Sequence, residues 1–123
     1  MGGYQGSLAV NLLSSVIDDE TISQPVDVEG RTSVTFYVTG TGTTSSGVVT
    51  LETSMPVGSA TNPQEVQDYA GTWSAITTVN ASDVTGGQQK FVSISPSAFS
   101  RVRARVSTVI GGGGSISVGL VAV

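Results

Sequence analysis

Three arginines at alternating positions are the strongest chemical signal in the sequence. Arg101, Arg103 and Arg105 are three of only five basic residues in the 123-residue chain. In a β-strand this spacing places three guanidinium groups on one face, with the apolar residues between them on the other. Guanidinium groups bind carboxylates through paired hydrogen bonds. Two interpretations follow: a solvent-facing stripe paired with Asp or Glu on neighbouring strands, or a docking surface for an acidic partner such as the acidic patch of a neighbouring copy.

An acidic cluster is formed by Asp18, Asp19, Glu20, Asp27 and Glu29. Carboxylate oxygens of this kind are ligands for Ca²⁺. However, the spacing matches no EF-hand loop, and consecutive acids in a strand point to opposite faces. We therefore interpret the cluster as a solvated patch and predict no metal site.

The residue types needed for catalysis are scarce. The chain has no His and no Cys, which excludes imidazole catalysis, disulfides and thiolate metal sites. Lys90 is the only lysine, and neither Ser-x-x-Lys nor Gly-x-Ser-x-Gly occurs. The glycine-rich segments 40–47 and 111–115 lack the Lys-Ser/Thr ending of a phosphate-binding loop. We predict that the protein is not an enzyme and has no catalytic residues and no cofactor.

Charge and hydropathy exclude two classes of partner. The net charge of -4 disfavours nucleic acid, and no aromatic residues alternate with the three arginines. No apolar stretch approaches the roughly 20 residues of a membrane helix. The N-terminal segment lacks the basic residues of a signal peptide. We predict no nucleic-acid partner and no membrane partner.

The elements that must position these residues are β-strands. Valine, threonine, serine and glycine dominate the composition, whereas good helix formers are scarce. From residue 20 onward, period-2 alternation predicts seven strands, at 20–28, 33–40, 48–55, 72–79, 89–95, 101–110 and 115–123. The glycine-rich segments 41–47 and 111–114 between them are predicted to be hairpin connections. The fold class is therefore all-β, an antiparallel β-sandwich of about seven or eight strands, with the jelly roll as one arrangement.

Two features lie outside this regular pattern. Trp73 is the only tryptophan, and we expect it to anchor the core. The segment 56–71 is the longest without alternation, and connections of that length are often functional. It is either a contact surface or a crossover with a short helical turn.

The first 19 residues differ from the rest of the chain. Leu8, Val10 and Leu12 alternate as in a strand, with Leu13 and the aromatic Tyr4 nearby. We divide the chain into an N-terminal arm, 1–19, and a single β-sandwich domain, 20–123. The apolar segment either completes the sandwich or packs on a neighbouring copy. The candidate partner contacts are therefore Tyr4, Leu8, Val10, Leu12, Leu13, Arg101, Arg103 and Arg105.

The order of the strand sequences resembles a group of small β-sandwich proteins from tailed bacteriophages. The resemblance is carried by VDVEGRTSVTFYVTGTG, GVVTLETS, GTWSAIT and FVSISPSAFSRVRARVST, and it covers about residues 26–123. Members of that group are non-enzymatic virion proteins: capsid decoration or cement proteins, head fibres, and tail or baseplate domains. The longer segment 56–71 and the lack of an extra domain depart from many of them. Their motifs are structural strands, so no functional residue is carried over.

The resemblance implies a virion structural protein made in the host cytoplasm. We expect a capsid decoration or cement protein on the capsid surface, which binds the outer surface of the major capsid protein shell and stabilises it. A homo-oligomer is expected, with a trimer favoured. The alternatives are a tail, neck or head-fibre component, or a carbohydrate- or receptor-binding module. An aromatic platform for the latter would come from Tyr4, Tyr37, Tyr69 and Trp73.

Overall fold

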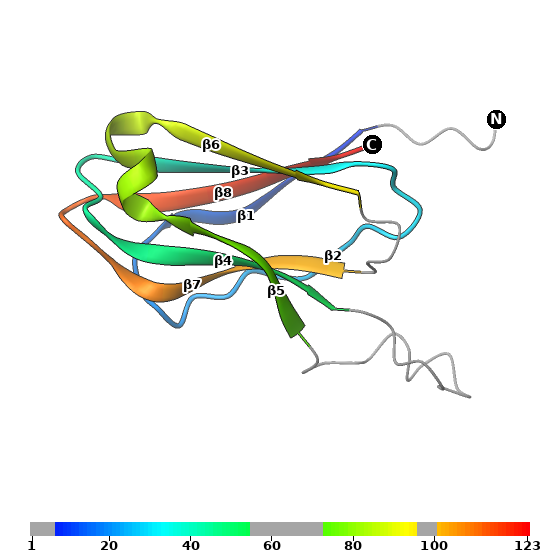
Figure 1. Ribbon diagram of the computed structural model, residues 1–123, viewed down its shortest axis with the longest axis horizontal. Helices are drawn as coiled ribbons and strands as arrows, with labels where there is room; N and C mark the ends of the chain where they lie inside the picture. Colours follow the sequence, from blue (N-terminus) through cyan, green and yellow to red (C-terminus); the bar gives the residue numbers. More distant parts are fainter. Residues whose placement is uncertain (1–6, 55–72, 96–100) are drawn as a thin grey trace.

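The computed structural model describes residues 7–54, 73–95 and 101–123. This part of the chain forms eight strands and one short 3₁₀ helix, which confirms the all-β prediction (Figure 1). The elements are β1 (Leu8–Val16), β2 (Val26–Asp27), β3 (Val34–Thr41), β4 (Ser46–Ser54), β5 (Trp73–Asn80), η1 (Ala81–Gly87), β6 (Gln89–Ile94), β7 (Arg101–Gly111) and β8 (Ser115–Ala122). Tyr4, Tyr69 and the segment 56–71 lie outside the described residues. Within the described ranges, no helix has the length and apolar character needed to cross a bilayer.

The strands form two four-stranded antiparallel sheets packed face to face (Figure 1). Sheet A has the order β1-β8-β3-β6, and sheet B has the order β2-β7-β4-β5. The neighbouring pairs β1·β8, β2·β7, β3·β6 and β4·β5 are those formed when one long hairpin is rolled over on itself. The sandwich therefore has jelly-roll strand order.

Each of the seven strands predicted after residue 20 is present, but two connections differ from the prediction. The segments 41–47 and 111–114 do not close hairpins, because β3 and β8 belong to sheet A whereas β4 and β7 belong to sheet B. Alternation identifies the side chains that face the core, but both sheets have such a face, so it does not assign a strand to a sheet. The first predicted strand is reduced to the two residues of β2 at an edge of sheet B, as Pro25 suggests.

The core lies between the sheets and is built from the inward positions of each strand. Its largest fully buried side chains are Phe36, Leu51, Ile116 and Leu120, together with a set of valines. Ala81 and Val84 of η1 are also fully buried. Trp73 is not among these residues, so the prediction that it anchors the core is wrong.

Strand β1 pairs with β8 at an edge of sheet A. A bulge after Asn11 shifts the register, and Leu13 rather than Leu12 takes the inward position opposite Val118, where it is 4% exposed. Leu8, Val10 and Leu12 are half-buried and pack against the same core. Residues 8–16 thus form a strand of the chain's own sandwich in this structure. The domain boundary at residue 19, and contacts of these residues with a partner, stay predictions.

Candidate functional site

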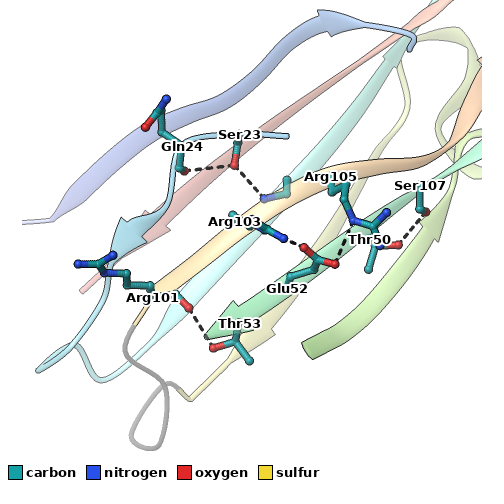
Figure 2. A network of polar contacts seen from close by, with 10 residues as sticks. Ser23, Gln24, Thr50, Glu52, Thr53, Arg101, Arg103, Arg105 and Ser107 are labelled. Atoms are coloured by element: carbon teal, nitrogen blue, oxygen red, sulfur yellow. Dashed lines mark hydrogen bonds and ion pairs between the residues drawn. The ribbon is translucent and has the colours of Figure 1, made fainter. Parts of the chain in front are cut away.

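The three predicted arginines lie side by side on the outer face of sheet B. Strand β7 runs between β2 and β4, and its register places Arg103 opposite Glu52 and Arg105 opposite Thr50. The Nε of Arg103 donates to Oε1 of Glu52 at 2.8 Å, and the Nε of Arg105 donates to Oε2 at 3.0 Å (Figure 2). The exposed fraction of the side chain is 7% for Glu52, 19% for Arg103 and 35% for Arg105. Pairing with a carboxylate on a neighbouring strand is therefore confirmed for Arg103 and Arg105.

Trp73 lies on this face and completes the site. It is the first residue of β5, paired with Ser54 of β4, and the guanidinium carbon of Arg103 lies 4.1 Å from the centroid of its rings. A guanidinium stacked on an indole gains a cation–π attraction while its edge stays available for hydrogen bonds. We call Glu52, Trp73, Arg103 and Arg105 the arginine–tryptophan cluster.

Hydroxyl groups bond β7 to β4 on one side and to the segment before β2 on the other. Thr50 donates to the hydroxyl of Ser107 at 2.7 Å on the β4 side. The hydroxyl of Ser23 accepts the backbone N–H of Ala104 at 2.9 Å on the other side (Figure 2). Within the described residues, the hydroxyl of Ser54 is buried without a hydrogen-bond partner. The bonds made by Thr50 and Ser23 hold the backbone that carries the three arginines in a fixed position.

The sequence left Glu52 and Trp73 out of the candidate site. Glu52 alternates with Thr50 and Ser54, which placed it on a polar face of its strand, but nothing in the chain indicated that β4 would lie beside β7. Trp73 was expected to anchor the core, or to join an aromatic platform, and not to contact the arginines. Both side chains join the arginines only because of the strand order in sheet B.

The outer face of sheet A has the opposite character. The register places Tyr37 between Phe91 of β6 and Gly119 of β8. Phe91 is 62% exposed and Val121 is 37% exposed. We call the outward-facing positions of the four strands the uncharged face, which consists of Ala9, Asn11, Thr35, Tyr37, Thr39, Thr41, Gln89, Phe91, Ser93, Ser115, Ser117, Gly119 and Val121. None of these side chains carries a charge.

The acidic residues singled out in the sequence are exposed. Asp18, Asp19 and Glu20 occupy a turn closed by a hydrogen bond from the N–H of Thr21 to the carbonyl of Asp18. Within the described ranges, no three acidic side chains come close enough together to hold a metal ion.

A surface pocket of about 370 Å³ lies at one end of the sandwich. It is lined by Ile17, Thr41, Gly42, Ile110, Gly113, Gly114 and Ser115. This lining has no ionisable side chain and therefore no acid or base for catalysis.

Comparison with known proteins shows the fold. No family model matches the sequence, and no curated protein matches it. The SPBc2 prophage-derived protein YomS superposes with a TM-score of 0.58 at 11% identity, covering 95% of this chain and 92% of YomS. The PBSX exported protein XepA gives 0.54 at 14% identity, covering 94% of this chain but only 36% of XepA. The K2 cleaved adhesin domain of Lys-gingipain gives 0.54 at 16% identity, covering 99% of this chain and 85% of that domain.

These similarities establish a β-sandwich shared with a prophage-derived protein and with an adhesin domain. At such identities the similarity shows the fold alone. The partners of this chain therefore have to be argued from its own two outer faces.

Proposed function

We propose that the protein is a non-enzymatic structural protein of a bacteriophage particle, and that it binds the outer surface of the capsid shell as a decoration protein. The main support for this proposal is the uncharged face. It presents an aromatic ring that is 62% exposed, at Phe91, on a strand whose backbone is fixed by the ladder to β3.

The composition of the uncharged face is that of a protein–protein contact. The cores of such interfaces are depleted in charge and enriched in aromatic residues. Phe91 and Tyr37 are neighbours across β6 and β3, and Val121 extends the apolar surface onto β8. A rigid sheet face loses little conformational entropy on docking, so more of the contact energy remains as affinity.

The fold and the sequence pattern support a bacteriophage origin for the protein. YomS, which is described as prophage-derived, matches almost the whole chain in fold. The strand sequences resemble those of tailed-phage virion sandwiches. A partner that binds only the folded chain adds RT ln(1 + [L]/Kd) to its stability, about 2.7 kcal/mol at a hundredfold excess over Kd.

The first test is the copy number of the chain in purified particles from its source, measured by quantitative mass spectrometry against the major capsid protein. A simple ratio to that protein supports decoration of the shell. A few copies per particle would move the protein to the neck, tail or fibres, and absence from particles would overturn the proposal.

The second test identifies the face. Cosedimentation with shells that lack the protein should weaken at least about tenfold for Phe91→Ser, since an aromatic anchor residue contributes more than about 1.4 kcal/mol. Val109→Ser is the matched control, because Val109 is 51% exposed and lies on β7 of the other sheet. Equal binding by the Phe91→Ser variant and the wild type would exclude the uncharged face as the capsid contact.

A carbohydrate-binding module is the second candidate, and the same face favours it. An exposed aromatic ring stacks on sugar rings, and the amides of Asn11 and Gln89 and the surrounding hydroxyls suit neutral hydroxyl groups. Of the predicted aromatic platform, Tyr37 lies on this face, whereas Trp73 is stacked with Arg103 on the other. Binding on a glycan panel that Phe91→Ser abolishes would favour this function, and no binding on the panel would exclude it.

A further inference from the structure

The arginine–tryptophan cluster leaves guanidinium groups free to bind a further acceptor. Within the described part of the chain, the hydrogen bonds of the Arg103 and Arg105 side chains run through Nε to Glu52. Each guanidinium therefore retains its two Nη groups, which are the pair of donors that faces a carboxylate in a bidentate contact. Glu52 neutralises one of the two positive charges, so these three side chains carry a net charge of +1.

These donors are already ordered. Glu52 accepts a hydrogen bond from each arginine, and the guanidinium carbon of Arg103 lies over Trp73, 4.1 Å from the ring centroid. An incoming carboxylate therefore does not have to immobilise two long side chains, which otherwise lowers the affinity of a contact. Arginine and tryptophan are also the residue types that dominate binding energy in protein interfaces.

A surface of opposite charge lies beside β7 at the edge of the same sheet. We call it the acidic turn, Asp18–Glu20. The N–H of Val106 donates to the carbonyl of Thr21, and the N–H of Ile110 donates to the carbonyl of Ile17. The acidic turn therefore lies alongside residues 107–109, beyond the arginines on β7. Its three side chains are exposed and form no ion pair within the described residues.

We propose that the outer face of sheet B is a self-association surface, on which the acidic turn of one copy binds Arg103 and Arg105 of a second copy. Both surfaces lie along β7 of one sheet. About a two-fold axis, each turn can therefore meet the arginines of its partner, which gives a dimer in place of the trimer that the resemblance favours. Ile22, 49% exposed and bridged to Arg105, lies between them as an apolar centre for the contact.

This inference is independent of the proposed function, since it concerns the purified chain alone. Its failure would leave shell binding through the uncharged face unaffected, and failure of shell binding would leave self-association unaffected.

The experiment is sedimentation velocity of the full chain over a concentration series. At low ionic strength we expect a mass above that of one chain, falling to one chain near 1 M salt, where the Debye length is about 3 Å. The double variant Asp19→Asn/Glu20→Gln should raise the dissociation constant at least about tenfold. Glu29→Gln/Asp83→Asn changes the net charge equally at exposed positions outside the turn, and it should retain the wild-type constant.

A second variant tests the other side of the contact. Arg105→Gln should weaken association to a similar degree, with circular dichroism verifying that the variant is folded. The proposal is overturned if the wild type sediments as one chain at low ionic strength, if Asp19→Asn/Glu20→Gln associates like the wild type, or if the two double variants weaken association equally.

Discussion

The phenol ring of Tyr37 occupies the space that a side chain on Gly119 would need. The two residues are register partners on β3 and β8, and a Cβ atom built on Gly119 would overlap the ring and its hydroxyl group. The φ angle of Gly119 is not in the left-handed region, so the requirement for glycine is steric. The uncharged face therefore depends on the absence of a side chain in its centre.

We expect Gly119→Ala to lower the free energy of unfolding by about 1–3 kcal/mol, since an added methyl group must displace Tyr37. Urea denaturation measures the change. In a Tyr37→Ala background the same substitution should cost less, because the ring is no longer there. An equal cost in both backgrounds would show that Tyr37 is not the cause.

Glu52→Gln tests the pairing of the arginines. The substitution keeps the size of the side chain but removes the charge shared by Arg103 and Arg105. We expect a loss of about 1–3 kcal/mol, because two charge-assisted hydrogen bonds are weakened and the partial exposure of the arginines moderates the effect. Glu29→Gln, at an exposed position, should leave the denaturation midpoint unchanged. A Glu52→Gln variant as stable as the wild type would mean that the buried carboxylate contributes nothing.

Trp73 gives the cluster a fluorescence signal. Arg103→Lys removes the planar group stacked on the indole and should shift the emission maximum to longer wavelength as water reaches the ring. Arg105→Lys is the matched control, since Arg105 bonds the same carboxylate but Arg103 is the side chain that stacks on Trp73. Identical emission spectra from both variants would contradict the stacking.

Leucines in β1 test whether residues 8–16 belong to the sandwich. Leu13→Ala removes a side chain that is 4% exposed and should cost about 2–4 kcal/mol. Leu12→Ala, at the half-buried bulge position, should cost less than half as much. A segment that detaches as an arm would make both substitutions neutral in urea denaturation.

Gly47 at the start of β4 should resist substitution more than Gly86. Its φ is +115°, and an added Cβ would lie 2.7 Å from the carbonyl oxygen of Val109 and 2.8 Å from the Cα of Ile110. Gly86 has a φ of +71° and open space around it, so Gly86→Ala should cost only about 1–2 kcal/mol. We expect Gly47→Ala to lower the thermal midpoint much further. Equal midpoints would show that backbone contacts at Gly47 do not constrain the start of β4.

Local sequence predicted the strands because the alternation of side chains is a property of a single strand. All seven strands after residue 20 are present, and Arg101, Arg103 and Arg105 lie on one face as their spacing requires. Of the two interpretations of the arginines, pairing with a carboxylate on a neighbouring strand is correct for Arg103 and Arg105. The local sequence could not name Glu52, which is 51 residues away from Arg103.

The errors share one physical origin. The glycine-rich segments 41–47 and 111–114 were predicted to be hairpins because they separate adjacent strands, and Trp73 was assigned to the core because of its size. In each case the outcome depends on which strands become neighbours. That is decided by contacts between distant parts of the chain.

The sequence by itself therefore determined that this protein is an all-β sandwich, and for most strands it determined which side faces the core. Only the tertiary structure decided the strand order, and with it the two outer faces. Strands from both ends of the chain meet in sheet A to assemble an uncharged surface around Tyr37, and β4, β5 and β7 meet in sheet B to bring Glu52 and Trp73 to the arginines. The reason is that a two-residue period fixes the direction of a side chain locally, whereas its neighbours are fixed by how the whole chain closes around one core.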